Sequence, residues 1–272
     1  MADADRGRAP MTGLLSAYDE QLRGAAELRG AADVRTIGPV VVGVFPGGTG
    51  FASYRDLAGL GERRIRSLVG EVRAHFAGSP EVVTAEWKTR GHDIAPGLDA
   101  ALRDAGFVPE EAESVMLGEA VALSVDVPIP DGIVLREVRD ADGIRAMERM
   151  QAEVFGHGDG DARAAHMIAR IAAGDDVVLW IAEAEGQVIS AGRLEPVPGT
   201  DFAGIWGGAT VGEWRGRGVY RALTAKRAQA ALARGLRLLH SDSTEFSRPI
   251  LERAGMRKVT TTTPYVWARA DG

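Results

Sequence analysis

A glycine-rich junction between a predicted strand and a predicted helix, in the stretch ATVGEWRGRGVYRAL, places the strongest constraint on the fold. Gly216 and Gly218 lack the side chains that would hinder a tight turn, so neighbouring N–H groups can point at one anion. The helix that follows, to about Gly235, adds the positive end of its dipole. Arg215 and Arg217 each bring a guanidinium group suited to phosphate. The junction predicts a phosphate-binding turn.

For two spaced glycines alone, a plain turn with solvated arginines is the simpler interpretation. The neighbouring elements favour phosphate binding, because a strand precedes the turn and a helix of some twenty residues follows it. A further strand, a short helix ending at Gly255 and a β-rich tail complete the order. We therefore expect an α/β domain with a mixed, mainly antiparallel sheet flanked by helices.

The same residues resemble the signature of the GNAT superfamily of N-acetyltransferases: Arg or Gln, two residues, Gly, one residue, then Gly or Ala. In its frequent form R-G-x-G-x-G, the signature falls on Arg215, Gly216, Arg217, Gly218, Val219 and Tyr220. Tyr220 departs from the pattern, since it replaces a small residue. The resemblance covers about residues 132–268, and the order of strands and helices matches as well.

This resemblance implies that acetyl-CoA is a co-substrate bound along the junction. The backbone of Gly208, Ala209 and Thr210 would pair with the pantetheine arm as an added strand, while the amides of residues 215–220 hold the pyrophosphate. It also implies that the strand before the signature diverges from the strand after it, which leaves a wedge for the thioester.

The implied chemistry is N-acyl transfer, with direct attack of a primary amine on the thioester in a ternary complex. The chain has no cysteine, which excludes an acyl-thiol intermediate on the protein. A lysine-like amine, with a pKa of about 10.4, needs a base or a water relay at neutral pH. The expected acceptor is a small-molecule or peptide amine.

The family pattern is incomplete at two catalytic positions. Gly204 stands where many members carry a glutamate base, and Leu251 stands where many carry a tyrosine acid. We expect Glu195, beside the acceptor cleft, to serve as the base and Tyr265, near the tail, as the acid. The other candidates are listed here: Glu153, His157, Asp201, Asp242 and Glu245.

A stretch with two prolines and a glycine, SVDVPIPDG, predicts a domain boundary. The expected domains are an N-terminal α/β domain at 1–127 and the N-acetyltransferase domain at 128–272. The N-terminal half shows a weaker version of the same order of elements, so it is interpreted as a degenerate GNAT-like repeat. Its FPGGTGF stretch has no Lys or Arg until Arg55 and is interpreted as a plain turn.

Composition limits the class of partner. A formal net charge of -6 argues against nucleic acid, and no apolar run approaches the roughly 18 residues of a membrane span. The N-terminus has no secretory pattern, so we expect a cytoplasmic protein without membrane contact. His157, Asp159, Asp161 and His166 lie close in sequence but lack the helical spacing of metal ligands, so no metal is expected.

Two other functions remain open at this stage. A non-catalytic acyl-CoA-binding sensor or scaffold would keep the turn without the catalytic Glu and Tyr. A related tandem enzyme would take an acyl or aminoacyl group from a different carrier. The sequence leaves the oligomeric state and the identity of the acceptor open.

Overall fold

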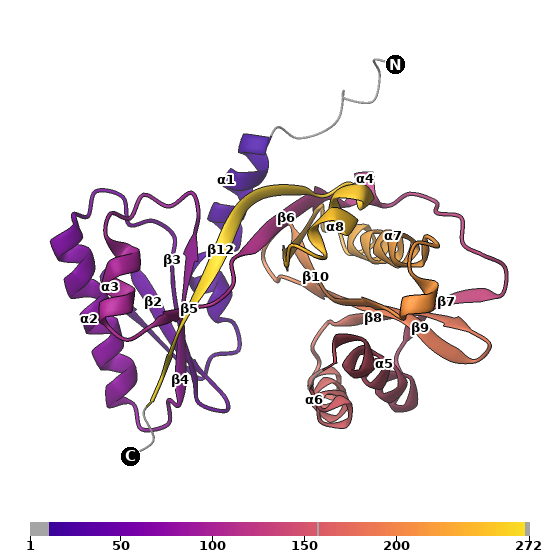
Figure 1. Cartoon of the computed structure of the whole chain (residues 1–272), viewed down its shortest axis with the longest axis horizontal. Helices are drawn as coiled ribbons and strands as arrows, with labels where there is room; N and C mark the ends of the chain where they lie inside the picture. The colour runs from indigo at the N-terminus through magenta and orange to yellow at the C-terminus, as the bar shows by residue number, and fades with distance from the viewer. Residues whose placement is uncertain (1–10, 157, 270–272) are drawn as a thin grey trace. The chain divides into compact units, whose positions relative to one another are not determined.

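The computed structural model describes residues 11–156 and 158–269. Contacts between residues divide this part of the chain into two compact units. Unit 1 consists of residues 116–241 and 246–257, and unit 2 consists of residues 11–115, 242–245 and 258–269. Each unit is an α/β sandwich in which helices cover a sheet (Figure 1).

Unit 1 has the sheet order β6-β11-β10-β9-β8-β7, with β10 and β11 parallel and the ladders from β10 to β7 antiparallel. Its elements are the end of β6 (Glu113–Glu119), α4 (Ala120–Leu123), β7 (Ile133–Val138), α5 (Ala141–Phe155), α6 (Gly160–Ala172), β8 (Val178–Ala184), β9 (Gln187–Pro196), β10 (Phe202–Thr210), the 3-10 turn η2 (Gly212–Trp214), α7 (Val219–Leu232), β11 (Leu238–Ser243) and α8 (Arg248–Ala254). This mainly antiparallel α/β arrangement is the expected fold class.

The helices of unit 1 divide between the two faces of its sheet. Helices α5 and α6 lie on one face, and α7 and α8 lie on the other (Figure 1). Met147 of α5 and Met167 of α6 pack on β8 and β9, whereas Ala228 and Ala231 of α7 pack against β10 and β11. The alanines allow α7 to approach the sheet closely.

Unit 2 has the sheet order β1-β2-β3-β4-β12, and β5 pairs with β12. Its elements are α1 (Met11–Gln21), the 3-10 turn η1 (Gly24–Leu28), β1 (Asp33–Ile37), β2 (Val40–Phe45), β3 (Thr49–Tyr54), α2 (Glu62–Gly78), β4 (Thr84–Arg90), α3 (Leu98–Asp104), β5 (Val108–Pro109), the start of β6 and most of β12 (Arg257–Ala268). Strands β3 and β4 are parallel and joined through α2, as β10 and β11 are through α7. The two units share this strand-helix-strand motif.

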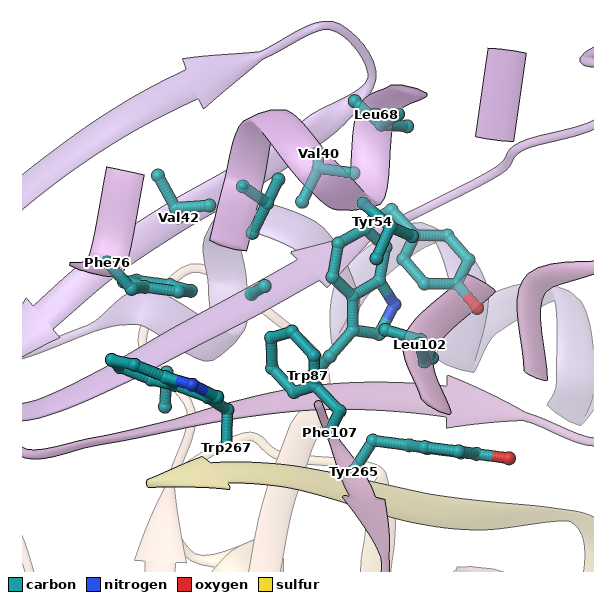
Figure 2. Packing of buried hydrophobic residues seen from close by; sticks show 14 of the residues in the cluster. Val40, Val42, Tyr54, Leu68, Phe76, Trp87, Leu102, Phe107, Tyr265 and Trp267 are labelled. Carbon is teal, nitrogen blue, oxygen red and sulfur yellow. The ribbon is translucent and has the colours of Figure 1, made fainter. Parts of the chain in front are cut away.

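The last strand of the chain belongs to the core of unit 2. Trp267 packs in one cluster with Trp87 and Phe76, and Tyr265 lies beside Phe107 in the same cluster (Figure 2). The boundary expected after residue 127 assigns all of 128–272 to one domain. In the structure, by contrast, residues 258–268 extend the sheet of unit 2, and residues 116–127 belong to unit 1.

No helix among the described residues is long and apolar enough to cross a membrane. In the same residues there is no group of three or more His, Cys, Asp or Glu side chains placed to hold a metal ion. His157 lies outside the described residues.

Candidate functional site

The N-terminus of α7 is open to an anion. Gly216 and Gly218 have φ angles of 75° and 83°, so both adopt the left-handed conformation that glycine takes without strain. Gly218 is the N-cap of α7, no side chain caps it, and the first turn holds no acidic residue. By contrast, Asp140 caps α5 and Asp159 caps α6. The first N–H groups of any helix lack a carbonyl partner within the helix, so the first amides of α7 can donate to the oxygens of a ligand.

The two arginines of the turn, Arg215 and Arg217, are exposed. Arg215 Nε donates to the carbonyl oxygen of Thr210 at 3.0 Å, which ties the turn to the end of β10. The guanidinium carbon of Arg217 lies 4.9 Å from the ring centroid of Trp214. Both guanidinium groups keep further N–H donors for a phosphate.

Strand β10 carries a bulge just before this turn. Its register with β9 changes between Trp206, opposite Arg193, and Ala209, opposite Ala191, so β10 has one extra residue there. Gly207 adopts a φ of 61°, and the buried amide of Gln151 on α5 donates to its carbonyl oxygen. The bulge is therefore held from the α5 side.

Strands β10 and β11 form a wedge. Their parallel pairing covers only residues 202–204 with 238–240, although β10 continues to Thr210 and β11 to Ser243. The last pair is Gly204 with His240. The edge of β10 from the bulge to Thr210 is thus the place where an extended ligand can pair. Gly208, Ala209 and Thr210 lie on this edge, between the end of the pairing and the α7 turn.

Glu195, Gly204 and His240 form a row across three neighbouring strands. A Cβ atom on Gly204 would lie 2.2 Å from Trp206 Nε1 and 3.1 Å from His240 Nε2. The imidazole and the indole thus fill the space that a side chain at position 204 would occupy. The rings of Trp206 and His240 meet edge to face at 5.2 Å between centroids.

Glu195 is held in ion pairs on this row. Its carboxylate accepts from Arg193 Nε at 2.5 Å and from Arg170 of α6 at 3.4 Å. Burial alone would raise the pKa of Glu195, but the two arginines lower it below its ordinary value. A carboxylate that holds its proton less tightly is a weaker base, so the geometry disfavours the expected role.

Tyr265 lies in unit 2, on β12. Its hydroxyl donates to Asp99, and burial together with this hydrogen bond raises the pKa of Tyr265 to about 12. Its neighbours are in the core cluster of unit 2 (Figure 2). Its hydroxyl is thus already engaged within unit 2.

Val219 and Tyr220 begin α7 and differ in their surroundings. Val219 is buried and packs with Leu223, Ile189 and Ala182. Tyr220 is half-buried, and a Cβ atom on Gly208 would lie 2.6 Å from its hydroxyl oxygen. The large residue at this signature position is thus accommodated by a glycine on the facing strand.

His240 and Gln151 were not among the site residues expected from the sequence. His240 lies in a strand whose pairing partner is far away in the chain, and Gln151 is one polar residue on an amphipathic helix. No local spacing marks either residue. The register of β10 with β11 places His240 beside Gly204, and the packing of α5 brings Gln151 to the bulge.

The fold of unit 1, with its wedge and α7 turn, is that of the GNAT acetyltransferases. Residues 144–256 match the model of the acetyltransferase (GNAT) family, which places this region in that family. The matched segment runs from α5 to the start of β12 and includes the whole turn. A search of curated proteins found no significant match.

Solved structures similar to this chain cover both of its units. A GCN5-related N-acetyltransferase from Kribbella flavida has a TM-score of 0.68 at 16% identity, with 98% of each chain covered. A tandem GNAT protein from the clavulanic acid biosynthesis pathway, in a structure without acetyl-CoA, has a TM-score of 0.63 at 14% identity, with 100% of this chain and 98% of that chain covered. At such identities the likeness establishes only that this chain shares the two-domain α/β fold of these proteins.

Proposed function

We propose that this protein is an acyl-CoA-dependent N-acyltransferase that transfers an acetyl group from acetyl-CoA to a primary amine. The observation that carries this proposal is the start of α7, which has two left-handed glycines, no capping side chain and no acidic residue in its first turn. Exposed Arg215 and Arg217 lie in the turn that leads into it. The uncapped helix start offers free N–H groups and the positive end of the helix dipole, and the two guanidinium groups add full positive charges. Together these features favour the binding of a pyrophosphate.

In this proposal the pantetheine arm pairs with the edge of β10 at residues 208–210, and the amides of residues 217–220 hold the pyrophosphate. The thioester then lies at the bulge. The amine approaches from the face covered by α5 and α6, where the row of Glu195, Gly204 and His240 lies.

We assign His240, rather than Glu195, as the group that accepts the proton of the amine. Histidine is the most frequent general base in enzymes, and Glu195 is committed to two arginines. Because Nε2 of His240 is buried beside Trp206, the assignment requires the indole to move when the amine binds. His240→Gln should then lower kcat far more than Glu195→Gln does.

A non-catalytic acyl-CoA-binding module is the second candidate. Gly204 and the buried Leu251 on α8 favour it, since neither supplies the acid or base that the resemblance implies. A calorimetric titration with acetyl-CoA tests the binding that both candidates share. Release of CoA in the presence of a panel of primary amines then separates them.

A thiol reagent is well suited to that assay, because the protein has no cysteine of its own to react. Amine-dependent thiol release supports the enzyme. Binding without release from any amine supports the module, and absence of binding contradicts both.

A further inference from the structure

Arg227 is a buried cation on the sheet-facing side of α7. Its side chain is fully buried, and it donates to Leu223 O at 3.2 Å and to Thr224 Oγ1 at 3.1 Å. Its guanidinium carbon lies 5.7 Å from the ring centroid of Tyr220, and among the described residues Tyr220 and Arg193 are the ionisable groups that act on its pKa. By comparison, the buried Arg90 of unit 2 pairs with Glu27 at 2.6 Å. A buried guanidinium without a carboxylate is costly, so its presence calls for an explanation.

Two strand glycines make room for Arg227 and its partner. A Cβ atom on Gly192 of β9 would lie 2.6 Å from Arg227 Nη1, and one on Gly208 of β10 would lie 2.6 Å from the Tyr220 hydroxyl oxygen. Neither glycine has a positive φ angle, so the backbone conformation does not require them. A glycine inside a strand weakens the strand, and here each glycine marks the close approach of a side chain to the strand backbone. The two glycines accommodate a Tyr–Arg pair beneath the bulge.

Tyr220 and Arg227 lie beside the wedge between β10 and β11. Tyr220 is in the first turn of α7, at the end of the proposed pyrophosphate site, and its hydroxyl lies against Gly208 in the bulge of β10. Tyr220 is half-buried, whereas Arg227 behind it is fully buried. The hydroxyl is thus at the boundary of the wedge, and the positive charge lies behind it in the protein interior.

We propose that Tyr220 donates its hydroxyl proton to the thiolate that leaves the thioester, and that Arg227 is the positioning residue that stabilises the phenolate formed. The proposal rests on the acyl-transfer function proposed above. The amine nitrogen forms a bond to the acyl carbon, the carbon–sulfur bond breaks, and the Tyr220 proton moves to sulfur. The proton lost by the amine passes to His240, which releases it to solvent, and solvent returns one proton to the Tyr220 oxygen.

The test measures how strongly the protein recognises the sulfur atom of the coenzyme. Calorimetric titration of the full-length protein at pH 9 compares CoA with desulfo-CoA, which lacks the thiol. We expect the wild type to bind CoA about tenfold more tightly than desulfo-CoA, because one charge-assisted hydrogen bond to sulfur has this size. Tyr220→Phe should bind both compounds with the same affinity.

Three comparisons make the result decisive. A Tyr220→Phe protein that weakens CoA and desulfo-CoA equally shows only a packing role and overturns the proposal. Tyr265→Phe should keep the tenfold ratio; if it abolishes the ratio instead, Tyr265 is the donor and the proposal is overturned. Arg227→Met should reduce the ratio while keeping or raising the melting temperature, and a lower melting temperature with an intact ratio contradicts its role.

The same titrations separate this proposal from the function on which it rests. A wild type that binds neither CoA nor desulfo-CoA contradicts the acyl-CoA function itself. A wild type that binds both compounds equally well retains that function and overturns the assignment of Tyr220.

Discussion

Positive φ angles at Gly216 and Gly218 give the α7 turn its shape at the scale of single residues. Any other residue at these positions would be strained by roughly 1–2 kcal/mol. A Cβ atom on Gly218 would also lie 3.2 Å from Pro128 O, whereas one on Gly216 would meet nothing within 4 Å. Gly216 is therefore the cleaner position for a substitution, because added bulk there enters only the space of the ligand.

Arg217→Ala should weaken acetyl-CoA binding by about 1–3 kcal/mol, as expected for the loss of one charge-assisted hydrogen bond to phosphate. Its guanidinium is exposed and stacks on Trp214, so the melting temperature should change little. Arg139→Ala, which removes another exposed arginine, is the control for net charge. Equal affinities of the two variants would show that Arg217 does not contact the coenzyme.

Glu195→Gln should destabilise the protein in a pH-dependent way. The pKa of Glu195 is lowered in the folded state, so its ion pairs stabilise the fold above the unfolded pKa of about 4.3. This stabilisation disappears as the pH falls through the lowered pKa. Denaturant titrations should show a deficit of about 1–3 kcal/mol at pH 7 that closes towards pH 3. A deficit independent of pH would show that shape, not charge, matters at this position.

The residues of the turn were predictable from the sequence because turn geometry is local. Gly216, Gly218 and the arginines are adjacent, and glycine is needed where φ is positive. The row across β9, β10 and β11 was not predictable in the same way. Glu195, Gly204 and His240 meet only through strand register, so the sequence led to Glu195 without showing its two arginine partners.

Helix α7 differs from α5 and α6 at the scale of secondary structure elements, because it begins without a carboxylate. Charge at its first turn should affect stability and binding in opposite directions. A negative side chain near a helix N-terminus stabilises the helix by about 0.3–1 kcal/mol, yet it repels a phosphate at the same place.

Arg221→Glu should therefore raise the melting temperature slightly and weaken acetyl-CoA binding. Arg221 is exposed in the first turn of α7. Lys226→Glu makes the same change of charge further along the helix and should alter affinity much less. If both variants bind the coenzyme equally, the helix start is not the phosphate site.

Most elements of unit 1 follow from local patterns. Ile144, Met147 and Met150 stand at the helical spacing typical of α5, and the Glu185–Gly186 turn joins β8 to β9 as a hairpin. In unit 2, the short polar β1 and the glycine-containing β3 carried no clear alternation and were not expected as strands. The parallel pair of β3 and β4, which makes the repeat visible, therefore emerges only in the structure.

The C-terminal strand decides how the chain is divided at the scale of the whole molecule. Strand β12 follows the α8 helix of unit 1 but places Trp267 in the core of unit 2. The residue pattern of a predicted strand does not show which strand it pairs with. A domain boundary predicted from a proline-rich stretch therefore does not show that β12 belongs to unit 2. Trp267→Ala should cost about 3–5 kcal/mol of folding stability, measured by denaturant unfolding. A smaller loss would mean that β12 adds little to this core.

The chain should bind one coenzyme molecule, although it contains two similar motifs. The junction between β3 and α2 has an N-cap, Gly61, with a φ of -79°, and an acidic first turn containing Glu62. A carboxylate there disfavours a phosphate. A calorimetric stoichiometry near one is the expected result, whereas a value near two would show that the repeat has kept its own site.

The central claim, that the α7 turn holds the coenzyme, is tested most directly by a matched pair of glycines. Gly216 and Gly235 flank the same helix, both are exposed, both have a φ of 75°, and a Cβ atom on either would meet nothing within 4 Å. Gly216→Val and Gly235→Val should therefore lower the melting temperature of the free protein by similar amounts. Titration with acetyl-CoA should show wild-type affinity for Gly235→Val and at least about a tenfold loss for Gly216→Val, since a branched side chain enters the phosphate space. Equal affinities of these two variants would contradict the account.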